Sequence, residues 1–217
     1  MERRSSVNNT KNDFIIAFWK LYEKQPLEKI SVSELCRIAG YNRTTFYVYY
    51  DNIVDLLDKA VDRILAPLTA NLDRLSALGI DRNYILLERI YLELLKANRE
   101  YASILLDRHR LYVLEDKIKE MFGPLLRKSY ADGKRDEAAI NYIIEYRISA
   151  PFGVIARWLR HRDMEDEEMI HLLFKIASQG VRGMTDTIQG NEEEDIHAEE
   201  DKVLNDIITA IRKQKEW

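Results

Sequence analysis

Five side chains that can form hydrogen bonds lie within residues 43–49, and this pattern is typical of contact with nucleic acid. The planar guanidinium of Arg43 can donate two hydrogen bonds to O6 and N7 of guanine, and Thr44 follows it directly. The hydroxyl groups of Thr45, Tyr47 and Tyr49 suit phosphate oxygens, which position a protein without carrying sequence information. These residue types therefore predict base contacts by Arg43 and Thr44 and backbone contacts by the three hydroxyls.

A short helix is predicted just before this segment. Ser31 can accept a hydrogen bond from the N–H of Glu34, whose carboxylate can reach back to Ser31 in a capping box. Leu35, Ile38 and Ala39 then follow at helical spacing, and we expect them to face inward.

A second short helix should carry the five side chains. Gly40 favours the left-handed conformation that ends a helix, and Asn42 is a good N-cap for the next one. Phe46 and Tyr50 lie four residues apart on one face of this helix and should pack inward. The two helices and their glycine turn predict a helix-turn-helix, in which the second helix lies in the major groove of DNA.

The tyrosines at positions 47, 49 and 50 have a simpler interpretation as core aromatics of a helical bundle. We accept this interpretation for Tyr50. A helix presents only one stripe of about 100° to a core, however, so Tyr47 and Tyr49 should diverge from Phe46 and Tyr50. Exposed phenols on such a helix are better explained by phosphate contacts.

Residues 10–57 resemble the DNA-binding domain of the TetR family of bacterial transcriptional regulators. The resemblance rests on Ala17 and Leu21, on Ile30-Ser31-Val32, on the run from Ala39 to Tyr50, and on Leu56 and Leu57. Within the family, Thr10-Lys11, Glu23 to Pro26 and Asn42 to Tyr47 are similar to a subgroup that includes relatives of the dihydroxyacetone kinase regulator.

The resemblance assigns roles residue by residue. It implies base recognition by Arg43, Thr44 and Val48, phosphate contacts by Thr45, Tyr47 and Tyr49, and backbone contacts by Ser31 and Ser33, at the start of the second helix. The sequence departs from the family at Ile53, where a lysine is common at the start of the fourth helix, so one phosphate contact should be missing. Arg3, Arg4 and Lys11 could compensate from an N-terminal arm.

Charge supports this interpretation only locally. The 217-residue chain has a formal net charge of -4, which argues against a protein that coats nucleic acid through bulk attraction. Residues 1–52 contain eight Lys or Arg and six Asp or Glu, so the positive end of the chain is the expected DNA-binding end. Specific contacts must therefore supply much of the affinity.

The remaining length predicts a second, helical domain. With four prolines, eight glycines and apolar residues at helical spacing, we expect an all-α protein: a three-helix helix-turn-helix domain over residues 1–52 and a helical ligand-binding and dimerisation domain over 53–217. The expected helices of this second domain begin near residue 52, where one should bend at Pro67, and continue over about 82–98, 100–108, 111–130, 135–161 and 165–188.

Breaks and ends of these helices can also be expected from the sequence. Gly123-Pro124 and Pro151 should break or kink their helices, and residues 190–195 should form a solvated acidic linker. An amphipathic terminal helix should follow, and its apolar face needs a partner. That face consists of Val203, Leu204, Ile207, Ile208 and Ile211.

We expect no catalysis, no cofactor and no metal site, because His109, His161, His171 and His197 are scattered and no phosphate-binding glycine loop or nucleophile elbow occurs. The single Cys36 excludes an internal disulfide and is most simply a packing residue. Without a signal peptide or a long apolar run, we expect a cytoplasmic protein that does not enter the membrane.

The resemblance further implies a homodimer that binds a palindromic operator in double-stranded DNA and releases it, most often as a repressor, when a small-molecule effector binds. The two last main helices would form the dimer, through segments that hold Ile144, Ile148, Phe152 and Ile155, and then Met169, Leu173, Ile176 and Gly180. Five residues could line an effector pocket, although aromatics at this spacing are also ordinary core: Tyr91, Tyr112, Tyr146, Arg147 and Trp158.

Two alternatives belong to other classes of protein. The chain could be a DNA-bound interaction protein that is regulated by, or acts on, a protein partner through its C-terminal tail; a body without an enclosed pocket would favour this. It could also be a helical enzyme or binding module that kept the fold and lost DNA binding.

Overall fold

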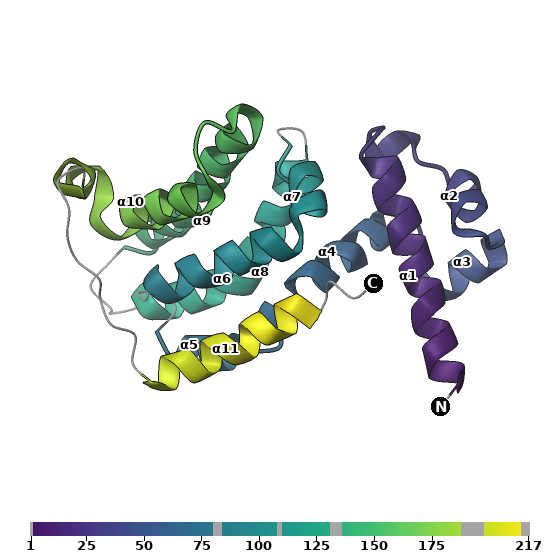
Figure 1. Ribbon diagram of the computed structural model, residues 1–217, viewed down its shortest axis with the longest axis horizontal. Coiled ribbons are helices and arrows are strands. Elements are labelled where there is room, and N and C mark those ends of the chain that lie inside the picture. The colour runs from purple at the N-terminus through teal and green to yellow at the C-terminus, as the bar shows by residue number, and fades with distance from the viewer. Residues whose placement is uncertain (1, 80–83, 108–109, 131–135, 188–197, 214–217) are drawn as a thin grey trace. The chain divides into compact units, whose positions relative to one another are not determined.

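The computed structural model describes residues 2–79, 84–107, 110–130, 136–187 and 198–213, and every regular element in these ranges is a helix (Figure 1). The expected all-α class is confirmed. The chain forms two compact units, residues 1–65 and residues 66–216. The division falls within α4 (Ile53–Thr69), so most of the helix that we assigned to the second domain packs with the first unit.

The first unit is built around aromatic side chains of its longest helix. It contains α1 (Glu2–Tyr22), the single 3-10 turn η1 (Leu27–Lys29), α2 (Val32–Ala39), α3 (Arg43–Tyr49) and the first part of α4. Phe14 and Phe18 on α1 are fully buried, as are Leu35 on α2, Phe46 on α3 and Leu56 on α4. Because each of these helices contributes to one core, the short helices α2 and α3 depend on α1 and α4 for their stability.

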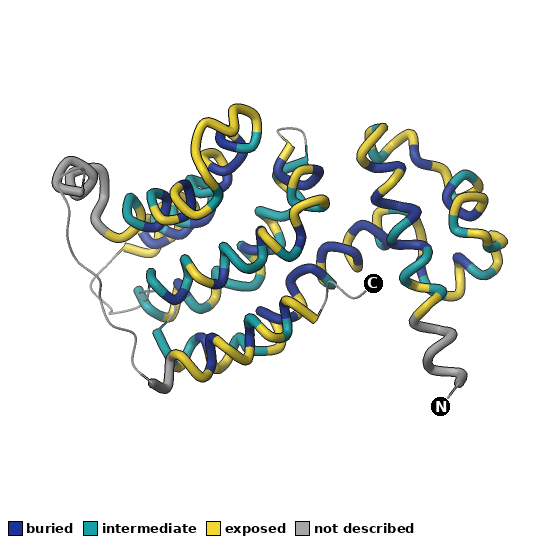
Figure 2. Tube along the Cα trace, viewed as in Figure 1, coloured by how far each residue is buried: buried dark blue, intermediate teal, exposed yellow. Residues whose placement is uncertain are grey.

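In its described residues, the second unit contains seven further helices after the end of α4. These are α5 (Leu72–Ala77), α6 (Tyr84–Ala97), α7 (Arg99–Leu105), α8 (Leu111–Tyr130), α9 (Glu137–His161), α10 (Asp166–Thr187) and α11 (Ala198–Lys213). Helix α6 packs against both α10 and α11, and α9 packs against α8 and α10. Figure 2 shows that the buried residues of these helices follow their facing sides.

Two features of the second unit differ from the sequence prediction. Helices α8 and α9 continue past Pro124 and Pro151, so the expected break occurs at neither proline, and a kink there stays a prediction. Helix α5, between Pro67 and Gly79, was not predicted, since its six residues are too few to establish a helical period. The expected acidic linker at 190–195 lies outside the described residues.

The terminal helix α11 finds its apolar partner within the same chain. Val203, Leu204, Ile207 and Ile211 are buried against the rest of the second unit, whereas Ile208 is only partly buried. Ion pairs flank this apolar face: Arg74 of α5 pairs with Asp206 (2.8 Å) and Arg89 of α6 with Asp201 (3.4 Å). The helix is therefore an integral part of the second unit.

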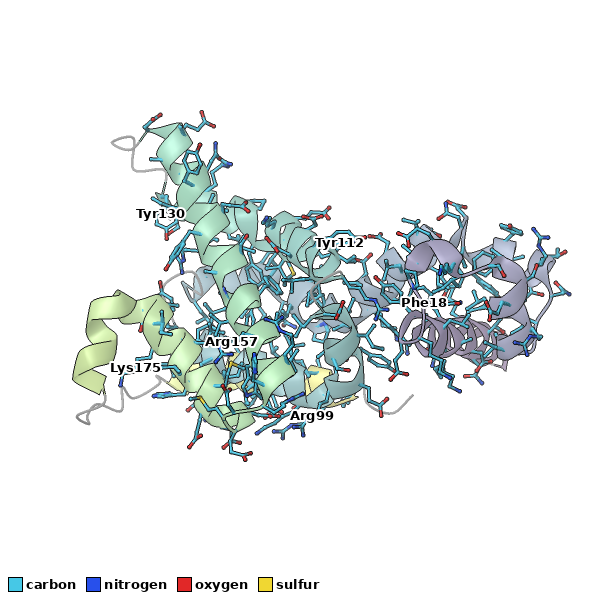
Figure 3. All side chains as sticks on the ribbon, turned by 90° about the horizontal axis from the view of Figure 1, so that it is seen from above. Phe18, Arg99, Tyr112, Tyr130, Arg157 and Lys175 are labelled. Carbon is cyan, nitrogen blue, oxygen red and sulfur yellow. The ribbon has the colours of Figure 1, made fainter. Side chains whose placement is uncertain are left out.

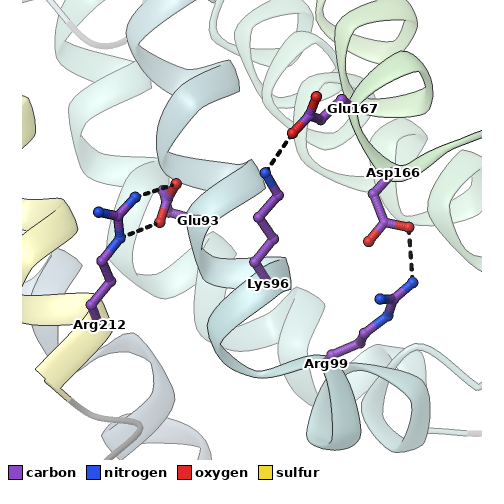
Figure 4. A network of polar contacts seen from close by, with 6 residues as sticks. All are labelled: Glu93, Lys96, Arg99, Asp166, Glu167 and Arg212. Atoms are coloured by element: carbon purple, nitrogen blue, oxygen red, sulfur yellow. Dashed lines mark hydrogen bonds and ion pairs between the residues drawn. The ribbon is translucent and has the colours of Figure 1, made fainter.

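Helix α6 is connected by charged groups to both of its neighbours (Figure 4). Glu93 accepts two hydrogen bonds from Arg212 of α11, at 2.8 and 2.9 Å. One turn further on, Lys96 donates to Glu167 of α10 (2.6 Å), and Arg99 of α7 pairs with Asp166 (3.2 Å). Exposed pairs of this kind each add little stability.

The Glu93–Arg212 pair predicts a dependence of stability on pH. Its hydrogen bonds from Arg212 hold the pKa of the Glu93 carboxyl below its usual value of 4.5. A lowered folded-state pKa contributes stability that is present above pH 4.5 and is lost as the pH falls below it. In thermal unfolding from pH 7 to pH 3, Glu93→Gln should melt below wild type at neutral pH, and the difference should shrink towards the acidic end.

The exposed Glu100 of α7 offers a matched control, since its carboxylate lies at the surface. Glu100→Gln should melt close to wild type at neutral pH. A Glu93→Gln difference that stayed constant down to pH 3 would show that the ion pair does not stabilise α11.

Candidate nucleic-acid interface

One of the two hydrogen bonds of the expected capping box is present at the start of α2. Ser31 lies in extended backbone conformation, and its Oγ accepts a hydrogen bond from Glu34 N at 3.2 Å. The reciprocal bond expected from Glu34 is absent among the described residues, because the carboxylate accepts from Gln25 Nε2 instead (3.2 Å). Glu34 thus connects α2 to the turn after α1.

The turn between α2 and α3 holds the second helix at a fixed angle. Gly40 has φ = 79° and ψ = 22°, a left-handed conformation that side-chain-bearing residues rarely adopt. Asn42 Oδ1 then accepts from Thr45 N (2.8 Å) and from Thr45 Oγ (3.0 Å), which caps α3. Tyr41 donates its hydroxyl proton to Asp13 of α1 (2.7 Å) and so fastens the turn to the longest helix.

One side of α3 is buried among aromatic rings. Phe46 and Tyr50 are 0% and 3% exposed, and both meet Phe14 of α1 edge to face, with ring centroids at 5.5 and 6.1 Å. Burial raises the pKa of Tyr50 to about 12, and its hydroxyl donates to the backbone carbonyl of Lys11 (3.3 Å). The expected inward positions of α3 are confirmed.

The opposite side of α3 faces outward. Arg43 and Thr44 are exposed, Tyr47 is 50% exposed and Val48 is 69% exposed. A valine that is this exposed gains nothing from core packing and is available for contact with a partner. These four side chains form a continuous surface on one short helix, which we call the α3 face.

The other residues expected to bind DNA lie at the edges of this surface. Ser31 and Ser33 are exposed on α2, and Thr45 and Tyr49 are partly buried on α3. The hydroxyl proton of Thr45 is used in the cap on Asn42, so in this structure Thr45 does not offer it to a phosphate. The Lys11 ammonium lies over the Tyr49 ring, 5.7 Å from its centroid.

Ile53 lies in an environment that disfavours DNA. Together with Ile30 and Val32, which flank Ser31, it lines an open groove with three carboxylates. The acidic residues of this groove are Glu28, Asp55 and Asp58. Where a lysine is common in the resembled family, this chain therefore presents an apolar side chain among acids, which would repel a phosphate.

In α2, the position of Ile38 differs from the prediction and the position of Cys36 agrees with it. Ile38, expected to face inward, is 37% exposed, because in an eight-residue helix Leu35 and Cys36 occupy the buried side. Cys36 is buried, as a packing residue should be. Burial raises the pKa of its thiol, which lowers the fraction of reactive thiolate at neutral pH.

Two of the residues predicted to bind an effector have packing roles. Tyr91 of α6 packs edge to face on Phe174 of α10, with centroids 5.2 Å apart, and burial raises its pKa to about 12. Trp158 of α9 is 3% exposed, donates from Nε1 to the carbonyl of Met164 (2.7 Å), and is covered by the guanidinium of Arg162 at 4.2 Å.

The other three predicted effector-binding residues do not share these packing roles. Tyr112 and Tyr146 are 55% and 67% exposed, and Figure 3 shows Tyr112 at the opposite end of α8 from Tyr130. Arg147 donates to the Tyr130 hydroxyl and lies over the Tyr84 ring (5.4 Å). It is about 16 Å along α9 from Trp158, at a rise of 1.5 Å per residue.

Tyr84 and Tyr130 are the aromatic partners of Arg147 that the sequence did not indicate. Tyr84 begins α6 and Tyr130 ends α8, so they are far from Arg147 in the chain and no short-range spacing connects the three. Only the packing of α6, α8 and α9 brings them together.

The described residues contain no group of three His, Cys, Asp or Glu side chains arranged to hold a metal ion. His171 of α10 contacts Glu88 of α6 at 3.0 Å and lies on an exposed surface. None of the helices in the described ranges is both long and apolar enough to cross a membrane.

Comparison with known proteins adds an observation from the second unit. Residues 88–179 match the family model TetR_C_8, described as a transcriptional regulator C-terminal region. A search of curated proteins found no match. The matched range extends from α6 into α10 and excludes the whole first unit, so it is independent of the residues that carry the helix-turn-helix resemblance. From this second, separate part of the chain, the match supports a transcriptional regulator of the TetR family.

Proposed function

We propose that this protein is a ligand-responsive repressor that binds a palindromic DNA operator as a homodimer in the cytoplasm. The observation that carries this proposal is the α3 face, where Arg43, Thr44, Tyr47 and Val48 point outward from a helix whose other side is fixed in an aromatic core. Its similarity to relatives of the dihydroxyacetone kinase regulator remains a hypothesis about its subgroup.

The α3 face suits the major groove of DNA. A seven-residue helix is about 10 Å long, and the groove is about 12 Å wide. Arg43, in the first turn, would contact guanine, while Tyr47 and Tyr49 would reach phosphates beside the groove. In a two-fold dimer the recognition helices would contact half-sites about 34 to 36 Å apart, and an effector that favoured another spacing would release DNA.

The dimer would use the outer side of α9. Ile144, Ile148, Phe152 and Ile155 on α9 are buried within the protomer, as are Met169 and Leu173 on α10, so these side chains are not available to a second copy. The outer side of α9 instead exposes Tyr142 (77%) and Tyr146 (67%), followed by Gly153 and Val154. Large exposed aromatics on a helix are typical of an interface.

A small-molecule effector would act by binding one of two states of the protein more tightly than the other. Its binding need only differ between two states by about 1 to 3 kcal/mol to control DNA affinity. Because Tyr112 and Tyr146 are exposed and Arg147 is remote from Trp158, the five expected pocket residues do not define one site. This dispersion favours a second candidate function, a DNA-bound regulator that responds to a protein partner.

Arg43→Ala tests the reading of DNA bases. Fluorescence anisotropy with DNA from upstream of the gene should show wild-type binding that weakens with salt. The variant should lose about 1 to 3 kcal/mol of discrimination, or roughly 5-fold to 150-fold, for the specific site. Arg160→Ala, which removes an equal charge from the exposed end of α9, is the matched control and should bind as wild type.

The titration either supports or refutes base recognition through α3. Loss of specific affinity in Arg43→Ala alone supports base recognition through α3. Equal binding by both variants to specific and random DNA would refute it. Adding candidate small molecules, or a cell extract fractionated by size, to the wild-type complex separates an effector from a protein partner as the cause of release.

The α9 interface has its own test. The double substitution Tyr142→Glu and Tyr146→Glu places like charges on both sides of a two-fold contact, so light scattering coupled to gel filtration should show a monomer. Tyr112→Glu, at a similarly exposed tyrosine on α8, should remain dimeric. A double variant that stays dimeric would place the interface elsewhere.

A further inference from the structure

A cationic cavity lies within the first unit, between α1, the end of α3 and α4. Its volume is about 460 Å³, and it is lined by Lys11, Asn12, Ile15, Tyr49, Tyr50, Lys59 and Arg63. Three of these side chains are cationic, and among the described residues none that lines it is acidic. The cavity therefore differs in sign from the acid-lined groove around Ile53.

The cations of this cavity are held by the surrounding structure. Lys59 Nζ donates to the carbonyl of Tyr49 (3.1 Å) and to Asp55 Oδ2 (2.8 Å), and it lies 5.4 Å from the centroid of the Tyr50 ring. Arg63 donates to Oδ1 of Asn12. Asp55 offsets the charge of Lys59, with which it forms an ion pair.

Lys11 is a cation of this cavity for which the structure shows, among the described residues, a ring contact in place of an ion pair. It is exposed, its backbone carbonyl is held by the Tyr50 hydroxyl, and its ammonium lies over the Tyr49 ring. The lining of the cavity combines ammonium, guanidinium and phenol groups, which are N–H and O–H donors for an anion. Phosphate oxygens are the acceptors that such a set of donors suits best.

We propose that this cavity binds phosphate oxygens, with Lys11 as the principal contact and Lys59 and Arg63 as supporting charges. Its position favours a DNA backbone phosphate as the source. Tyr49 ends α3, so when Arg43 contacts bases, the other end of the helix comes beside the backbone. This part of the inference rests on the DNA-binding function proposed above. The cavity would supply a phosphate contact that the apolar side chain of Ile53 cannot make.

The salt dependence of DNA binding tests this source. Each phosphate neutralised contributes about -0.9 to the slope of log K against log salt concentration. Lys11→Gln should therefore make the slope shallower by about 0.9 and weaken binding to specific and random DNA by the same factor. Lys20→Gln removes an equal charge from an exposed position of the same helix, outside the cavity, and should keep the wild-type slope.

A second titration tests free phosphate as the source. Inorganic phosphate is added to the full-length protein without DNA, against chloride at equal ionic strength, while the amide signals of Tyr49 and Tyr50 are followed by NMR. Saturable shifts in wild type and in Lys20→Gln, but not in Lys11→Gln, would support a site that takes free phosphate groups. Circular dichroism of each variant verifies that it is folded.

The two titrations separate failure of the cavity from failure of the function. A slope change confined to Lys11→Gln supports a DNA phosphate, and phosphate-specific shifts with an unchanged slope support a free phosphate group. If Lys11→Gln and Lys20→Gln behave alike in both titrations, the cavity proposal is overturned, even where Arg43→Ala abolishes specific binding. If wild type binds no DNA, the DNA-binding function fails, and the phosphate titration still decides the cavity.

Discussion

The burial of Phe46 and Tyr50 against Phe14 is the constraint on which the first unit depends. A helix of seven residues has too few hydrogen bonds to be stable alone, so α3 exists because two of its rings enter the core. Once those rings are fixed, the rotation of the helix is fixed as well. The outward direction of Arg43, Thr44, Tyr47 and Val48 then follows from the packing on the other side.

The same dependence of polar groups on packing appears in the second unit. Helix α6 packs between α10 and α11. Its Glu93 pairs with α11 and its Lys96 pairs with α10, because apolar contacts have already aligned these three helices. Arg147 likewise meets Tyr84 and Tyr130 because three helices converge there. In both units, apolar burial determines which polar groups meet.

The sequence was sufficient for features that depend on local chemistry. The cap at Ser31, the left-handed Gly40, the cap at Asn42 and the buried pair of Phe46 and Tyr50 each involve residues within four positions of one another. Features that depend on tertiary contacts were missed. The sequence did not indicate that α8 and α9 continue past Pro124 and Pro151, and no spacing indicated the cavity lined by Lys11, Lys59 and Arg63.

The docking of α11 has a consequence for shortened forms of the protein. Its four buried side chains cover apolar surface on the rest of the second unit, and residues 88–179, which match the family model, do not include it. A chain that stopped before α11 could still contain the matched region and the whole first unit. It would nevertheless expose that apolar surface to water, and we expect it to aggregate. In an assay of DNA binding alone, this aggregation would look like a loss of DNA recognition.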